Sequence, residues 1–523
     1  MENKIKELNI NNLTLEEKVG QLLMFAFHGT EFNDQILTQI EKLKVGGVIF
    51  FGRNIVTPEQ VKRLTSKIQE VAKIPLYIGV DQEGGTVQRI INGVTPFPGA
   101  MAISATNESN YEVSKCVGDD LRKMGFNMNF APVGDVNNNP NNPVINSRSY
   151  SDDPKVCAKY VISGAKGFLD SGVIPTCKHF PGQGDTSVDS HVSLPTVNKD
   201  IEALENTELL PFKLAIEGGL QGIMASHILY PALDDKFPAT LSKAIITDLL
   251  KDKMGFKGLI VTDSLTMGAI NNNFTHKEIV NLCVNAGVDL MIFCGKADLA
   301  DQEHIYNSLL EEVKNGNIPM ARVDESVSKL LKFKNDYILN NNFSCEYSEE
   351  EKIKIGTKLS ENSITLVKEN NFFPITDKTL VLFPKIKLFS LVDNADEEYV
   401  SLGTVFKRNN MTLDEIIYDS DIINNIDSVE SFLDKITSLQ KNYDKVILCT
   451  YNVTKDDYQT KLWKVLDKDK TMVVSMRSPY DINHLENVKN YICIYEATLL
   501  ALQSLTKAII KNDFKGKLPV KID

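Results

Sequence analysis

The residues best suited to chemistry lie in three short segments of the first half of the chain. The segment from Lys178 to His191 (KHFPGQGDTSVDSH) places a carboxylate and an imidazole two residues apart, at Asp189 and His191. In a turn, this spacing lets the carboxylate accept a hydrogen bond from the ring N–H, which fixes the tautomer and raises the basicity of the imidazole. The spacing indicates a proton shuttle near neutral pH, although Asp189 could equally cap a turn beside an exposed His191.

Two further segments carry ionisable groups. Asp263 ends the apolar run GLIVTD, and Asp81 begins DQEGGTVQR, which also contains Glu83 and Arg89. A carboxylate at the end of an apolar strand is either a reacting group or the N-cap of the following helix. Glu83 and Arg89 could form a structural ion pair. The residue types alone leave these alternatives open.

A repeated pattern of strands and helices through residues 1–342 must position these groups. Short apolar runs end in polar residues and are followed by longer helical stretches, which is typical of a parallel sheet covered on both faces. About eight such units predict a closed (β/α)8 barrel. The runs are QLLMFAF from Gln21, GGVIFFGRN from Gly46, LYIGVDQE from Leu76, FNMNFAPVGD from Phe126, VIPTCKH from Val173, GIMASH from Gly222, GLIVTD from Gly258 and VDLMIFCG from Val288.

The ionisable residues fall where the predicted strands stop, and in a barrel these carboxyl ends converge on one face. An open doubly wound sheet would also collect ligands at its strand ends, but the number of strands favours the barrel. The residues concerned are Asp81, Lys178, His179, His227 and Asp263.

The composition of the chain changes near residue 342. A polar, charged segment over residues 343–360 is typical of a linker that enters a helix. Residues 361–523 then contain four strand candidates separated in part by helical stretches: TLVLFP, YDKVILCTYN, TMVVSMRS and YICIYEA. We therefore expect a barrel over residues 1–342 and a smaller α/β sandwich domain over residues 361–523.

Composition excludes several classes of partner. The chain has 523 residues and a formal charge of −12, which argues against nucleic acid or an anionic membrane as the main partner. The first residues have no secretory signal pattern, and no apolar run approaches the length of a membrane span. The 8 cysteines form no C-x-x-C pair, so buried free thiols are expected. Together these features predict a cytoplasmic protein.

The segment KHFPGQGDTSVDSH closely resembles the signature of family 3 glycoside hydrolases, in their β-N-acetylglucosaminidase branch. The resemblance extends to DQEGG-x-V-x-R, NNPVINSRSYSDDP around Arg148, VTDSL, RSPYDI and GKLPV, in the expected order along the whole chain. The length is similar to that of two-domain members. One departure is Gln183, where the family usually has His; Gln keeps donor and acceptor capacity but cannot titrate.

The resemblance implies a retaining exo-β-N-acetylglucosaminidase that uses no metal or cofactor. Asp263 matches the nucleophile, His191 the acid/base and Asp189 its partner. A further set matches positions that hold the hydroxyls of the terminal sugar, for which Lys and Arg are strong charge-assisted donors; the set is Asp81, Arg89, Arg148, Lys178 and His179. The implied substrate is a small carbohydrate with a terminal N-acetylglucosamine, such as a peptidoglycan-derived N-acetylglucosaminyl–N-acetylmuramic acid fragment met in cell-wall recycling.

Several alternatives stay open at this point. A neutral imidazole base tolerates an anionic acceptor, so the enzyme could be a phosphorylase. A β-glucosidase of the same family would generally lack the loop that contains Asp189 and His191. A metal-dependent barrel hydrolase would bind zinc through His179, His191, His227 and Asp263, and a non-catalytic sugar-binding protein would have lost Asp263 or His191. The sequence leaves the natural aglycone and the oligomeric state open.

Overall fold

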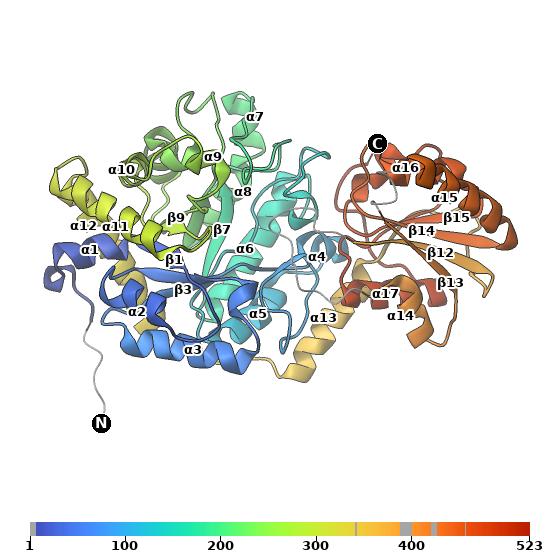
Figure 1. The fold of residues 1–523 in the computed structure, drawn as a ribbon, viewed down its shortest axis with the longest axis horizontal. Coiled ribbons are helices and arrows are strands. Elements are labelled where there is room, and N and C mark those ends of the chain that lie inside the picture. Colours follow the sequence, from blue (N-terminus) through green and yellow to red (C-terminus); the bar gives the residue numbers. More distant parts are fainter. Residues whose placement is uncertain (1–6, 340–342, 387–399, 420–425, 456, 523) are drawn as a thin grey trace.

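A computed structural model describes residues 7–339, 343–386, 400–419, 426–455 and 457–522 (Figure 1). The first half forms an eight-stranded parallel sheet in the order β10-β1-β2-β3-β6-β7-β8-β9. The parallel bridge between Val261 and Leu290 joins the two ends of this order, so the sheet closes and the predicted barrel is confirmed. The strands are β1 Leu23–Ala26, β2 Gly47–Phe50, β3 Tyr77–Val80, β6 Met128–Asn129, β7 Ile174–Phe180, β8 Gly222–Ala225, β9 Leu259–Thr262 and β10 Met291–Phe293.

Helices surround the barrel strands and bury their apolar faces against them (Figure 1). Local sequence fixes where several begin: Thr57 caps α3 and is followed by Pro58, and Thr275 with Glu278 forms a capping box on α10, which satisfies the first N–H groups. The helices are α1 Leu15–Gln21, α2 Asp34–Glu41, α3 Pro58–Val71, α4 Ala100–Thr106, α5 Tyr111–Lys123, α6 Pro154–Asp170, α7 Ile201–Asn206, α8 Leu209–Glu217, a π-helix over Ala244–Lys253, α9 Gly268–Asn271, α10 His276–Ala286, α11 Leu299–Lys314 and α12 Met320–Lys334.

The second domain is a six-stranded sheet in the order β11-β16-β15-β14-β12-β13. Its strands are β11 Thr365–Lys368, β12 Thr379–Pro384, β13 Asp414–Tyr418, β14 Lys445–Thr450, β15 Thr471–Ser475 and β16 Tyr491–Cys493. Within the described part of this six-stranded sheet, only the β11–β16 pairing is antiparallel. Helices cover both faces, as Figure 1 shows, with α14 Leu402–Arg408 and α17 Leu499–Lys511 on one and α15 Ile426–Leu439 and α16 Tyr458–Val465 on the other. The predicted α/β sandwich is confirmed.

The two halves are joined by a helix. Most of the predicted linker over residues 343–360 belongs to α13 Glu349–Ser363, which packs against α4 and α5 of the barrel and against α17. The three domain ranges 1–342, 343–360 and 361–523 stay a prediction. Direct bonds also connect the halves: the Ser151 hydroxyl donates to the Pro519 carbonyl at 2.5 Å, and the Lys517 amide to the Ala105 carbonyl at 2.9 Å. Within the described ranges, none of the helices combines the length and apolarity that crossing a bilayer requires.

Candidate active site

A pocket of about 440 Å³ lies at the carboxyl ends of the barrel strands, where the sequence placed the reacting groups. Seven of the eight predicted site residues line it, and the eighth, Asp189, contacts one of them. The lining residues among the eight are Asp81, Arg89, Arg148, Lys178, His179, His191 and Asp263. Side chains separated by up to 182 positions in the sequence are therefore brought to one pocket by the convergence of the strand ends.

Asp189 and His191 form a compact pair in the loop after β7. Asp189 Oδ1 lies 2.7 Å from His191 Nδ1 and also accepts the backbone N–H of His191 at 2.9 Å. Because Nδ1 is bonded to Asp189 and His191 lines the pocket, Nε2 is the ring nitrogen left to exchange a proton. Burial lowers the pKa of His191, but the Asp189 hydrogen bond and the charges of Asp263 and Asp189 outweigh it, so this pKa is raised above its ordinary value of 6.5.

The loop containing His191 is held against the segment that follows β9. The backbone N–H of Gly268 donates to the His191 carbonyl at 3.1 Å, and that of Ala269 to the Ser190 carbonyl at 3.1 Å. Gln183 adds a third restraint, because its buried side chain donates to the Ser190 hydroxyl at 3.2 Å. The glutamine that departs from the family motif thus holds the residue next to His191.

Asp263 follows β9 and is fixed by its neighbours. Its backbone N–H bonds to the Ala225 carbonyl of β8 at 3.0 Å, and its Oδ1 accepts the Ser264 N–H at 2.7 Å. Burial raises the pKa of Asp263, but the charges of His227, His179 and His191 outweigh it and the pKa is lowered. The carboxylate therefore stays ionised at neutral pH.

His227 is buried, and its Nε2 lies 2.9 Å from the Ser264 carbonyl. It is not among the residues that line the pocket, so it contacts the segment of Asp263 from behind the lining.

An ion cluster forms another part of the pocket wall. Arg148 donates to both oxygens of Glu83, at 2.9 and 2.8 Å, and Lys178 contacts Glu83 at 2.7 Å and Asp81 at 2.6 Å. Burial raises the pKa of Glu83, but the charges of Arg148 and Lys178 lower it well below its usual range. The sequence left open an ion pair between Glu83 and Arg89; Arg148 and Lys178 are partners of Glu83 that it did not indicate. The cluster presents fixed donors to a polar ligand.

A bulge in β7 explains how two consecutive residues reach the same pocket. In a regular strand, Lys178 and His179 would point to opposite faces. The pairing of β7 with β8 shifts by one residue between Lys178 and Phe180, and such a bulge re-aims side chains. Both Lys178 and His179 consequently line the pocket.

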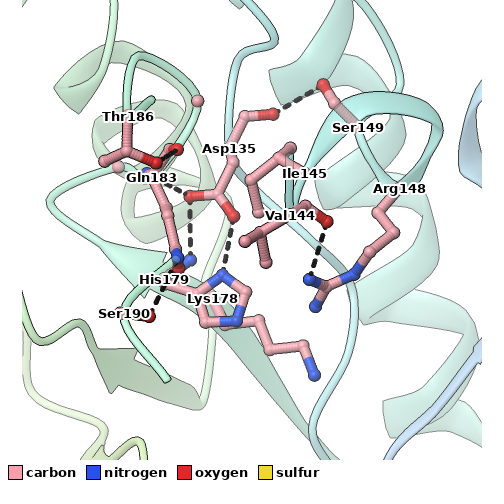
Figure 2. A network of polar contacts seen from close by, with 12 residues as sticks. Asp135, Val144, Ile145, Arg148, Ser149, Lys178, His179, Gln183, Thr186 and Ser190 are labelled. Atoms are coloured by element: carbon pink, nitrogen blue, oxygen red, sulfur yellow. Dashed lines mark hydrogen bonds and ion pairs between the residues drawn. The ribbon is translucent and has the colours of Figure 1, made fainter. Parts of the chain in front are cut away.

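Asp135 anchors this bulge and the turn that follows it (Figure 2). The fully buried carboxylate accepts the His179 ring nitrogen Nδ1 at 2.7 Å, the His179 backbone N–H at 3.1 Å and the Gln183 N–H at 2.7 Å. Sequence reasoning missed this residue. The signal was present, because Asp135 ends the predicted strand FNMNFAPVGD in the same way that Asp81 and Asp263 end theirs.

We expect Asp135→Asn to lower kcat/KM by about 10- to 100-fold, since an amide nitrogen would oppose His179 Nδ1 and reverse its tautomer. The kinetics of the purified variant test this. Ser149→Ala is the matched control, because the Ser149 hydroxyl donates to the backbone carbonyls of Asp135 and Ser151, accepts the Ser151 N–H and touches the Cys157 sulfur, and no bond to the Asp135 carboxylate is among these contacts. Wild-type kinetics for Asp135→Asn would show that the position of His179 does not depend on this carboxylate.

The zinc alternative finds no support in the geometry. Within the part of the chain that the structure describes, no three His, Cys, Asp or Glu side chains are grouped to hold a metal ion. The three histidines considered for zinc each have another hydrogen-bond partner: His179 contacts Asp135, His191 contacts Asp189, and His227 contacts Thr240 and Ser264.

Comparison with known proteins identifies the family. Residues 14–333 match the family described as the glycosyl hydrolase family 3 N-terminal domain. The chain therefore belongs to glycosyl hydrolase family 3, and it is a glycoside hydrolase.

Particular relatives cover one or both domains. A family 3 β-N-acetylglucosaminidase structure from Paenibacillus sp. str. FPU-7 is 36% identical, with a TM-score of 0.89 over 97% of this chain and 99% of that one. Beta-hexosaminidase A of Pseudoalteromonas piscicida is 33% identical over 71% of this chain and 70% of its own length. A beta-hexosaminidase of Nitrosomonas eutropha is 33% identical over 54% of this chain and 82% of its own.

Proposed function

We propose that this glycoside hydrolase is a retaining exo-β-N-acetylglucosaminidase. The observation that carries the proposal is the Asp189–His191 pair, joined at 2.7 Å and held by backbone bonds against the segment after Asp263. A proton donor and an ionised carboxylate then share one pocket, which is what double displacement requires. The names of the relatives from Paenibacillus and Pseudoalteromonas agree with this substrate class.

In the first step, a carboxylate oxygen of Asp263 attacks the anomeric carbon. The bond to the aglycone oxygen breaks, and that oxygen takes the proton from Nε2 of the His191 imidazolium. In the second step, neutral His191 takes a proton from water, whose oxygen attacks the anomeric carbon and breaks the ester bond to Asp263. The product keeps the β configuration and the imidazolium is restored. Asp189 holds the tautomer throughout and stabilises the cation.

The ion cluster supplies the sugar-binding wall in this proposal. Asp81, Arg148 and Lys178, together with Arg89 and His179, hold the hydroxyls of the terminal residue. Arg148 and Lys178 are almost completely buried, so their hydrogen bonds to a neutral sugar form in a low-dielectric site, where misplacement is costly. Such a wall orients the anomeric carbon toward Asp263.

We further propose that the natural substrates are peptidoglycan-derived fragments and that the enzyme acts on them in the cytoplasm. All eight cysteines are free, and six of them are buried, which suits a reducing compartment. The lining of the pocket favours an anionic component in the substrate or acceptor, because four cationic side chains face three carboxylates in a chain with a net charge of −12. The cations are Arg53, Arg89, Arg148 and Lys178, and the carboxylates are Asp81, Glu83 and Asp263. An acidic muramic acid aglycone would meet this requirement.

The same charge balance supports a second candidate, phosphorolysis. Phosphate would replace water in the second step and release the sugar as its 1-phosphate. A neutral base suits this acceptor, because a carboxylate base would repel it.

Release of nitrophenol from the 4-nitrophenyl β-glycosides of N-acetylglucosamine and glucose tests the proposal. We expect kcat/KM to favour the N-acetyl substrate by at least about 100-fold, or roughly 2.7 kcal/mol, with no loss of activity in a chelator. A preference for the glucoside, or inactivation by the chelator, would contradict it. Faster release with phosphate, together with formation of N-acetylglucosamine 1-phosphate, would select phosphorolysis over hydrolysis.

A further inference from the structure

The second domain contacts the barrel at a cavity that Glu83 and Arg148 also line. Glu496 follows β16 and is 2% exposed. Its Oε2 accepts the backbone N–H of Gly99 at 2.6 Å, at the residue that precedes α4, and its Oε1 accepts the Thr498 hydroxyl at 3.0 Å. A carboxylate of one domain is thus buried in the other with both oxygens bonded.

Gly85 lies against this carboxylate and extends the contact to Glu83. Gly85 has a φ of +62°, and a Cβ there would lie 2.7 Å from Glu496 Oε2 and 2.8 Å from the Gly99 Cα. The backbone of the turn therefore packs on the carboxylate without space for a side chain. Glu83 is two residues earlier, in strand β4 Gln82–Gly84, which pairs with β5 Val87–Gln88. A shift at Gly85 would move Glu83.

A second contact reaches Arg148. The Asn146 side chain donates to the Ser478 hydroxyl of the second domain at 3.1 Å. Asn146 begins the short 3-10 turn Asn146–Arg148 and has a left-handed φ of +42°. Asparagine is one of the few residues with a side chain that adopt this conformation with some frequency. The bond to Ser478 is one of the contacts that hold the turn.

The two contacts converge on one feature of the active site. A cavity of about 20 Å³ is lined from the barrel by Glu83, Gly85 and Arg148 and from the second domain by Tyr495 and Glu496. We propose that Glu496 and Ser478 are positioning residues, through which the second domain fixes the Glu83–Arg148 pair and thereby Lys178. This inference rests on the proposed function of that wall in sugar binding.

The expected effect is partial. The beta-hexosaminidase of Nitrosomonas eutropha matches 82% of its own length to 54% of this chain, so it is a much shorter protein. A relative of that length has no room for a second domain as large as the one in this chain, so we do not expect the second domain to supply a reacting group. Losing the contact should loosen the wall rather than remove a reacting group, and we expect Glu496→Ala to lower kcat/KM by about 10- to 100-fold.

Two readouts of the intact protein test the proposal. Hydrogen exchange of residues 82–89 reports the turn without any substrate, and kcat/KM on the N-acetylglucosaminide reports the wall. Glu496→Gln keeps an oxygen acceptor for the Gly99 N–H and should restore both to near wild type, and Ser478→Ala gives a smaller second perturbation. Ser504→Ala is the control. The buried hydroxyl of Ser504 on α17 donates to the Ser360 hydroxyl on α13 at 2.8 Å, so the variant removes a buried hydrogen bond of the second domain away from Glu496 and Ser478.

A double-mutant cycle with Glu83→Gln separates positioning from general stability. If Glu496 acts through Glu83, the losses in kcat/KM are less than multiplicative, whereas independent effects multiply. Faster exchange over 82–89 with a non-multiplicative cycle supports the proposal. Unchanged exchange in Glu496→Ala and Ser478→Ala, or multiplicative losses, would overturn it. Should Glu496→Ala not fold, Ser478→Ala carries the test, and unchanged exchange in that variant would overturn the proposal. An inactive wild type would refute the proposed function, while exchange would still measure the contact.

Discussion

Asp263→Asn is expected to lower kcat/KM for the N-acetylglucosaminide by at least about 10⁴-fold, the scale of losing a covalent nucleophile. Asparagine has the same shape, and its side-chain oxygen can still accept the Ser264 N–H that Oδ1 accepts at 2.7 Å. The amide lacks the negative charge needed to attack the anomeric carbon. Circular dichroism and thermal unfolding should match the wild type, so the loss would be chemical.

Asp298→Asn is the matched control for this prediction. Asp298 follows the neighbouring strand β10 and caps α11, where its carboxylate accepts the Ala300 N–H at 2.8 Å. It represents the purely structural role that Asp263 could have had. Asp298→Asn should keep kcat/KM within about 3-fold of wild type. Substantial activity in Asp263→Asn would show that Asp263 is not the nucleophile and has only a structural role, like that of Asp298.

The second large effect is expected at His191. His191→Ala removes the proton donor and should lower kcat/KM by about 10²- to 10⁴-fold. The loss should be smaller for nitrophenol, which leaves without a proton, than for a sugar aglycone. Steady-state kinetics on a nitrophenyl glycoside and on a disaccharide measure the difference. His28→Ala, at an exposed histidine outside the pocket, is the control. Equal losses on both substrates would contradict an acid role.

The assignment of His191 as the proton donor predicts the direction in which kcat/KM changes with pH. His191 must be protonated in the first step, so kcat/KM falls as the pH rises through its pKa. Asp189 and Asp263 raise that pKa against the lowering effect of burial. Asp189→Asn removes one of these carboxylates, so the pKa of His191 falls and the basic limb of the profile moves to lower pH. Measuring kcat/KM from about pH 5 to 9 tests this, and an unmoved basic limb would exclude the pair as the shuttle.

The barrel was predictable because its strands are buried on both faces. Such strands appear as continuous apolar runs, and each of the eight predicted runs overlaps a barrel strand. In the second domain, β11 and β13 were missed. The residues of β13 are mostly half-buried or exposed, and the four residues of β11 are separated from the end of α13 by one residue, so neither produces a distinct apolar run.

The sequence indicated which residues line the site, but it did not indicate which of them contact one another. Strand ends indicated Asp81, Lys178 and Asp263, because the rule needs only topology. The pairing of Glu83 depends on where the loop of Arg148 lies, and the bulge at His179 depends on the register of β7 against β8. Both arise from tertiary contacts between segments distant in sequence. The contact between Glu496 and Gly99 joins residues 397 positions apart and is likewise absent from any local pattern.

The most direct test of the central claim is to trap the glycosyl-enzyme. A 5-fluoro derivative of N-acetyl-β-glucosaminyl fluoride has a good leaving group, and its ring fluorine destabilises the oxocarbenium-like transition states of both steps. Mass spectrometry after brief incubation and digestion should find one added sugar on the peptide that contains Asp263, and none in Asp263→Asn. An adduct on another residue, or release of the α anomer without any adduct, would contradict the retaining mechanism assigned to this chain.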